Sequence, residues 1–149
     1  MFALLCDAVV TSPRVEVLRR LWEQDLASQV RLTYKGGFVL LAAGAAHAAS
    51  LDQVSGLTIS FLREQQNDDG GFGPWRNHPI GSDPWSTGVV LAGLCSLPEI
   101  LDRRMVERAV RWLSACQLDS GYWAYHFIDE GTAYAYWGLS EAAKLLETA

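Results

Sequence analysis

A stretch that occurs twice constrains this chain more than any other feature of its sequence. Residues 61–94 read as a helix end, a glycine-rich turn, an aromatic loop and the start of a second helix, and residues 112–139 repeat that order. The paired positions, 51 residues apart, are Gln66 and Gln117, Gly70 and Gly121, and Phe72 and Trp123. The second halves match at an offset of 45, because the first copy carries six extra loop residues. A period of this size predicts an array of stacked helical hairpins.

The residue types in the repeated turn favour a structural role. A glutamine at a helix end can bond backbone carbonyls that lack a partner within the helix. A glycine just beyond it permits the left-handed turn that ends a helix. We therefore expect positive φ at Gly70 and Gly121, and bonds from Gln66 and Gln117 to the backbone at neighbouring helix ends. The aromatic residue that follows each glycine then packs between hairpins.

Helical periodicity predicts three hairpins, each with a charged helix followed by a small, apolar one. The charged helices are expected at residues 13–30, 52–66 and 103–117, and the apolar helices at residues 38–47, 85–96 and 131–146. Tyr34-Lys35-Gly36-Gly37 reads as a break, and Asp52 and Asp102 read as helix caps. No sustained alternation favours a strand. The expected class is all-α, in one domain of residues 1–149 with an arm at 1–12 and repeats at about 13–50, 51–98 and 99–149.

The third hairpin carries a pattern made of Arg108-Ala109, Trp112-Leu113, Gln117, Gly121 and Trp123. This pattern resembles the QW repeat of the squalene-hopene and oxidosqualene cyclase superfamily and of its prenyltransferase relatives. Residues 61–72 fit it with aromatic substitutions, and the likeness extends from Leu51 to the C-terminus. It implies an α/α toroid with charged helices outside and small apolar helices inside. Three hairpins would form half of such a toroid.

Acidic residues stand near the starts of two apolar helices, where the helix dipole favours negative charge. Asp83 precedes Trp85, and Asp129-Glu130 precedes the helix expected from Gly131. In the class II terpene cyclases that the chain resembles, an acidic motif followed by Thr-Ala protonates an alkene, and Glu130 falls on the position of that acid. The resemblance implies catalytic roles for Glu130, Asp129 and Asp83, and helix capping is the alternative role for each.

Aromatic residues crowd the loops and the starts of the apolar helices. Their faces stabilise cations and hold flat polyenes by dispersion. Trp85, Tyr134 and Trp137 lie on apolar helices and are expected to line the inside, and Trp75 and His126 are further candidates for substrate binding from the loops. The expected substrate is an apolar small molecule, namely a polyprenyl or polyene chain.

Three functions fit these features. The first is a small cyclase or isomerase that folds a polyprenyl or polyene chain in an aromatic-lined cavity, with Glu130 or Asp129 as the acid. The second is a non-catalytic subunit that binds an apolar ligand or completes a partner's toroid. The third is a pericyclase that uses no acid and works by holding a polyene in a reactive conformation.

The charge and residue composition of the chain limits the kinds of partner and cofactor that we expect. A formal charge of −5, from 12 basic and 17 acidic residues, argues against nucleic acid. The prenyltransferase relatives bind zinc through Asp, Cys and His, and no such set stands at the matching positions, so we expect no metal and no cofactor. Three widely spaced cysteines and the absence of a signal-peptide pattern favour the cytoplasm.

The apolar inner helices of a half toroid would need a cover. We therefore expect a homodimer, or pairing with a partner of the same fold, because obligate interfaces resemble a core cut in half. Two-fold pairing of the inner faces would enclose one shared cavity. Folding of the arm at residues 1–10 over the open face is the alternative, and peripheral contact with a membrane is left open.

Overall fold

The computed structural model describes residues 12–46 and 51–147, and within them the chain forms helices and no strand. The helices are α2 (Ser12–Leu26), α3 (Thr33–Ala46), α4 (Asp52–Gln65), α5 (Pro84–Cys95), α6 (Arg103–Cys116) and α7 (Ile128–Glu147), with a short 3-10 turn, η2 (Pro98–Ile100), before α6. The expected all-α class is confirmed. Among the described helices, none is both long and apolar enough to cross a membrane.

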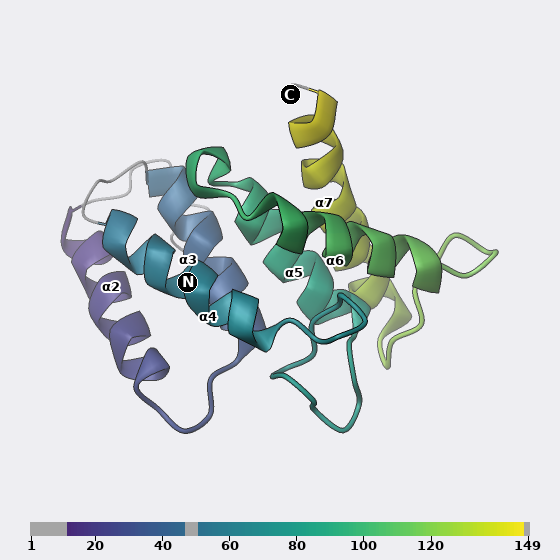
Figure 1. Cartoon of the computed structure of the whole chain (residues 1–149), viewed down its shortest axis with the longest axis horizontal. Helices are drawn as coiled ribbons and strands as arrows, with labels where there is room; N and C mark the ends of the chain where they lie inside the picture. Colours follow the sequence, from purple (N-terminus) through teal and green to yellow (C-terminus); the bar gives the residue numbers. More distant parts are fainter. Residues whose placement is uncertain (1–11, 47–50, 148–149) are drawn as a thin grey trace.

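The helices lie in two layers (Figure 1). In the inner layer α5 packs between α3 and α7, and in the outer layer α4 packs on α3 while α6 packs on α5 and α7. The third outer helix, α2, lies beside α4, where Trp22 Nε1 donates to Thr58 Oγ1 at 2.7 Å. The inner helix α5 is buried along most of its length, as its small and apolar composition predicts.

Glycines let the three inner helices approach one another closely. A Cβ at Gly37 would collide with the backbone carbonyl of Val89, and a Cβ at Gly88 would collide with that of Tyr134. In return, a Cβ at Gly93 would collide with the carbonyl oxygen of Gly37, and a Cβ at Gly138 would collide with that of Gly88. The α5–α7 interface therefore repeats the α3–α5 interface at the offsets seen in the sequence.

The turn that follows α4 has the predicted geometry and joins two hairpins. The φ angle is 97° at Gly70 and 85° at Gly121, in the left-handed region that glycine adopts without strain. Gln66 Nε2 donates to the carbonyl oxygens of Gly70 at 2.8 Å and Met105 at 3.0 Å, so it ties the end of α4 to the first turn of α6.

The turn that follows α6 keeps the same shape but lacks the second contact. Gln117 Nε2 donates to the Gly121 carbonyl at 2.9 Å, within its own turn. The predicted bond to a neighbouring helix end is confirmed for Gln66 and is wrong for Gln117. The reason is that no further outer helix follows α6 in the described part of the chain.

The aromatic residues behind the two turns are buried as predicted. The backbone N–H of Phe72 donates to Thr87 Oγ1 at 2.9 Å, and that of Trp123 donates to Thr132 Oγ1 at 3.1 Å. The two copies of the turn therefore share this hydrogen bond as well as their residue types.

The predicted break at residues 34–37 is wrong, because α3 begins at Thr33 and runs through both glycines. Adjacent glycines weaken a helix locally, but here each makes room for a neighbour. Gly37 lies against the backbone of Val89, and a Cβ at Gly36 would lie 3.2 Å from Leu62 Cδ2. Packing against α5 and α4 thus outweighs the local preference. Residues 47–50, which the predicted helix and first repeat include, lie outside the described residues.

Two other helix boundaries differ from the prediction by more than one residue, and one of the two predicted caps is absent. Helix α7 begins at Ile128 rather than Gly131, because the N–H of Gly131 already makes a helical bond to the Phe127 carbonyl at 3.0 Å. Helix α2 ends at Leu26 instead of residue 30. Asp102 caps α6 as predicted, accepting from the Met105 N–H at 3.1 Å. At α4 the cap position is Leu51, without a side-chain bond, and Asp52 lies in the first turn.

Candidate functional site

Five half-buried aromatic side chains form a continuous row across the inner layer. They come from α3, α5 and α7 and are Tyr34, Phe38, Trp85, Tyr134 and Trp137. Trp85 links the helices, with ring centroids 4.7 Å from Tyr34 and 5.5 Å from Tyr134. Tyr134 lies 6.1 Å from Trp137. We call these five side chains the aromatic row. It unites the three aromatic residues predicted to line the inside.

The aromatic row reaches across the middle helix. Phe38 on α3 and Tyr134 on α7 lie 6.4 Å apart, centroid to centroid, although α5 packs between their helices. The aromatic row therefore crosses over α5 and joins side chains of both flanking helices.

Sequence reasoning missed Tyr34, because residues 34–37 were expected to break the helix, and it missed Phe38, which was placed on the apolar helix at 38–47 but not among the lining residues. A signal for Tyr34 was present, since it lies 51 residues before Trp85. Extending the alignment of Gly37 with Gly88 by three residues toward the N-terminus would have paired these two rings. Phe38 has no aromatic partner at that offset, since Val89 stands there.

Asp83 is buried and acts as the cap of α5. Its Oδ1 accepts from the Ser86 N–H at 2.7 Å, and its Oδ2 accepts from the Ser86 hydroxyl at 2.8 Å. Burial raises the pKa of this carboxyl above its ordinary value, and the bonds from Ser86 oppose the shift. The capping role considered for Asp83 is therefore present in the structure.

Asp129 and Glu130 are exposed in the first turn of α7. Glu130 occupies the repeat position that Trp85 holds on α5 and Tyr34 holds on α3, at offsets of 45 and 51. Its place in the repeat is thus the place of a member of the aromatic row. Asp129 has no such correspondence, since it matches Pro84.

Tyr125 connects the carboxylates with the aromatic row. Burial, followed by the negative charges of Asp83 and Glu130 and the neighbouring Tyr34, raises the pKa of its phenol to about 12. A Cβ at Gly131 would lie 2.5 Å from Tyr125 Cβ, so the ring is held against the start of α7. The N-terminal ends of α3, α5 and α7 therefore meet around this phenol.

The two loop candidates lie apart from the aromatic row in their ring contacts. Trp75 is exposed and packs on His78 within its own loop, with centroids 4.2 Å apart. His126 is exposed between the rings of Tyr125 and Phe127, at 4.0 and 4.8 Å. The charge of His126 slightly lowers the pKa of Asp83, which places it near the start of α5.

In the part of the chain that the structure describes, no group of three or more His, Cys, Asp and Glu residues could hold a metal ion. Comparison of the chain with family models, curated proteins and solved structures gave no match. Its function is therefore argued from the geometry of the aromatic row and its neighbours alone.

Proposed function

We propose that this chain is half of an α/α toroid, and that the aromatic row binds an apolar, unsaturated chain of the polyprenyl or polyene type. The observation that carries the proposal is the contact of five half-buried rings across three helices. Flat rings hold such a ligand by dispersion and by burial of its apolar surface. The row itself contributes no charged side chain that would select a polar ligand.

The ligand-binding proposal is tested with cis-parinaric acid, a conjugated polyene whose fluorescence rises in an apolar site, and with geranylgeraniol as a competitor. We expect Trp85→Ala and Tyr134→Ala each to weaken binding by about tenfold, which corresponds to about 1.4 kcal/mol. Trp75→Ala is the matched control, because its ring packs on His78 in the loop. Equal affinity in all four proteins, or loss of binding only in Trp75→Ala, contradicts the proposal.

A second candidate function is acid-initiated cyclisation or isomerisation at the same face. It is favoured by the buried Asp83, whose pKa is raised, and by Glu130, which stands where the repeat places Trp85 and Tyr34. Protonation of an alkene would form a C–H bond and a carbocation, the ring faces would stabilise the cation, and loss of a proton would restore the acid. The reaction is balanced without any co-reactant.

The catalytic candidate is tested by product analysis after incubation with geranylgeraniol. An acid mechanism predicts that Glu130→Gln or Asp83→Asn loses turnover while parinaric acid still binds. Turnover that survives in both variants would instead indicate a pericyclase, which needs only the conformation of the bound polyene. Binding without turnover in the wild type would leave the non-catalytic binding subunit as the function.

A further inference from the structure

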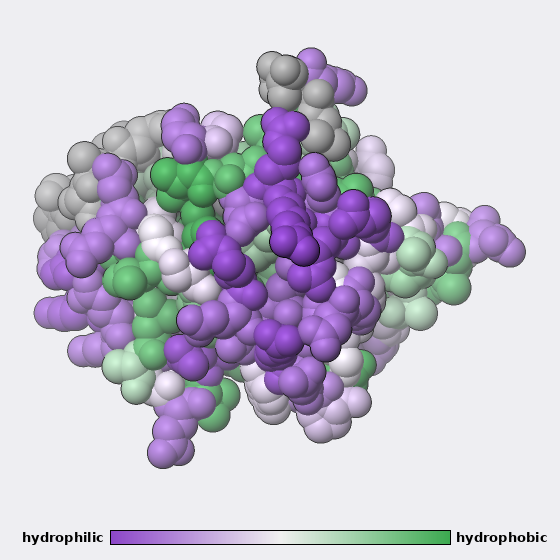
Figure 2. Space-filling model, in the orientation of Figure 1, coloured by the Kyte–Doolittle hydropathy of each residue, from purple (hydrophilic) through white to green (hydrophobic). Residues whose placement is uncertain are grey.

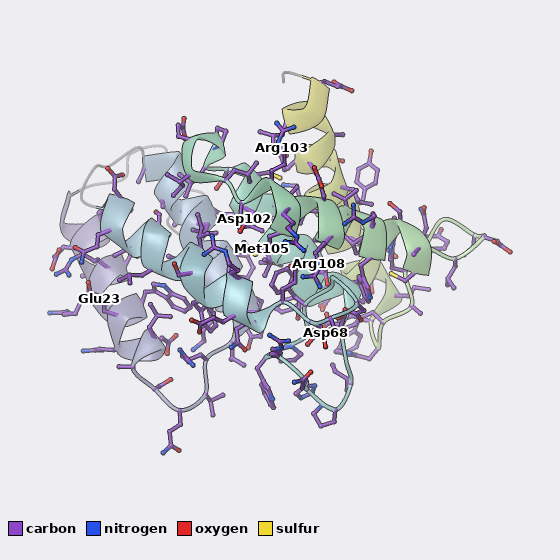
Figure 3. All side chains as sticks on the ribbon, in the orientation of Figure 1. Glu23, Asp68, Asp102, Arg103, Met105 and Arg108 are labelled. Carbon is purple, nitrogen blue, oxygen red and sulfur yellow. The ribbon has the colours of Figure 1, made fainter. Side chains whose placement is uncertain are left out.

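The junction between α4 and α6 shows how one hairpin joins the next. Arg108 Nη2 donates to the carbonyl oxygens of Asn67 at 2.8 Å and Asp68 at 3.0 Å, in the turn that follows α4. Figure 3 shows Arg108 above Asp68, on the α6 side that faces this turn. Farther along the same side of α6, Trp112 Nε1 donates to Asp69 Oδ2 at 3.0 Å.

The side of α6 that meets the preceding hairpin is a stripe at helical spacing. We call it the incoming stripe, and on α6 it consists of Met105, Arg108 and Trp112. At an offset of 51, the stripe on α4 consists of Val54, Leu57 and Phe61. Phe61 is 4% exposed and its ring lies 5.9 Å from that of Trp22 on α2, so α2 covers the Phe61 end of this stripe, whereas Leu57 stays 46% exposed.

The incoming stripe of α2 has no preceding hairpin to cover it within the described residues. The buried stripe of α6 (Val106, Ala109 and Leu113) matches the buried stripe of α2 (Val15, Leu18 and Trp22). In this register the positions of Arg108 and Trp112 fall on Val17 and Leu21, which are 45% and 55% exposed. Val17 is as exposed as its counterpart Leu57, which is 46% exposed, but Leu21 is exposed at the position where Phe61 is buried in a junction.

At the opposite end of the array, in the turn that follows α6, the positions that would contact such a stripe are uncovered. A Cβ at Gly70 would lie 2.8 Å from the Arg108 carbonyl, whereas a Cβ at Gly121 would meet nothing within 4 Å. In the same turn Leu118 is 44% exposed and Tyr122 is 53% exposed. An open groove of about 180 Å³ lies farther back along α6, toward its N-terminal end, and is lined by Leu101, Arg103, Val106, Glu107, Val110, Arg111 and Leu145.

We infer that the end of the array at α6 and its turn binds α2 of a second copy of this chain, head to tail. The inference rests on the proposed function, because it supplies the second half of the toroid. The junction between α4 and α6 is its template: the turn at Gln117 would receive the incoming stripe of α2 as the turn at Gln66 receives that of α6. A second copy is the occupant because its α2 carries the exposed Val17 and Leu21 at the positions that face the preceding turn in the junction between α4 and α6.

Apolar surface is distributed in agreement with this pairing. Figure 2 shows a mostly hydrophilic surface over α6, and where the last turn projects at the right it shows hydrophobic surface behind a hydrophilic tip. Exposed apolar side chains at both ends of the array would be buried by one kind of contact. Head-to-tail contacts either close into a ring or grow into a fibre. Closure into a ring of two copies would make the second half of the proposed toroid, with the two aromatic rows facing one shared space.

Light scattering at micromolar concentration tests the pairing. We expect the wild type at twice the chain mass of 16.4 kDa. The α2 variant Val17→Asp/Leu21→Asp and the turn variant Leu118→Asp/Tyr122→Asp should each be monomeric, because a head-to-tail dimer contains each end twice. Ile80→Asp, also at an exposed apolar residue but in the long loop, is the control that stays dimeric. Circular dichroism checks the fold, and serine replaces aspartate if a variant unfolds.

Mixing the two variants gives the decisive result. A head-to-tail pair made from one of each contains one contact between two intact ends, so the mixture should recover dimers that neither variant forms alone. A wild type that stays at 16.4 kDa overturns the inference. So do dimers that persist in both variants, as pairing through the inner faces would give. Dimers lost only in the turn variant overturn it as well, because like ends would then pair.

The same proteins separate this inference from the proposed function. A monomer whose parinaric acid binding depends on Trp85 would overturn the pairing and leave ligand binding standing. A dimer that depends on both ends but binds no polyene would overturn ligand binding and leave the pairing standing.

Discussion

Gln66 and Gln117 occupy the same place in two copies of one turn, yet only Gln66 bonds a second helix. We predict that Gln66→Ala lowers the free energy of unfolding by about 1–3 kcal/mol, because buried acceptors at Gly70 and Met105 lose their donor. Gln117→Ala removes one exposed bond and should cost about 0.5 kcal/mol. Urea unfolding of both variants below the dimerisation range measures the difference. Equal losses would show that the second contact of Gln66 adds nothing.

Asp83 predicts a pH dependence whose sign follows from its burial. Because the pKa of Asp83 is raised in the folded state, the folded chain holds this proton more tightly than the unfolded chain. Its contribution to stability is therefore greatest at low pH, and it is lost as pH rises from the ordinary value of 3.8 through the folded pKa.

Asp83→Asn should remove that slope while it keeps a side-chain acceptor for the Ser86 N–H. The measurement is the urea midpoint of the variant and of the wild type across this range of pH. The difference between the two midpoints should grow in favour of the variant as pH rises. A constant difference would mean that the charge of Asp83 carries no cost in the folded protein.

At the scale of the helices, the inner layer depends on glycines at its contacts rather than on helix propensity. Gly88→Ala should destabilise the protein by about 1–3 kcal/mol, because the new Cβ collides with the Tyr134 backbone and forces α5 and α7 apart. Gly56→Ala on α4 is the matched control, since a Cβ there meets nothing within 4 Å. It should stabilise the protein by about 0.5–1 kcal/mol. Thermal unfolding of both variants checks the opposite signs.

The start of α3 shows where local reasoning failed. Gly36 and Gly37 are poor helix formers, and nothing in residues 30–40 alone says that α4 and α5 need the room these glycines provide. The start of α7 was predicted at Gly131, three residues too far along the chain, for a related reason. Gly131 lies inside α7 and packs against Tyr125 from the preceding loop. In both cases a glycine that serves a contact was interpreted as a glycine that ends a helix.

For the molecule as a whole, the repeat predicted what two copies share and missed what one copy has alone. The left-handed glycines, the bonds of Gln66 and Gln117 within their own turns and the burial of Phe72 and Trp123 all belong to the shared turn. Three members of the aromatic row were predicted because they lie on the apolar helices. Phe38 was not, because its contact with Tyr134 depends on how α3 and α7 pack on either side of α5, which no local pattern encodes.

The matching interfaces on the two sides of α5 make the hairpin a transferable module. A copy of residues 52–102 inserted after residue 102 would present α3-type and α7-type surfaces to neighbours that already fit them. We predict that such a lengthened chain folds, with helical circular dichroism increased in proportion to the added residues. Arrays in which each unit contacts mainly its neighbours gain stability with each added unit. The glycine contacts of α5 therefore allow the protein to grow by duplication without a new interface having to evolve.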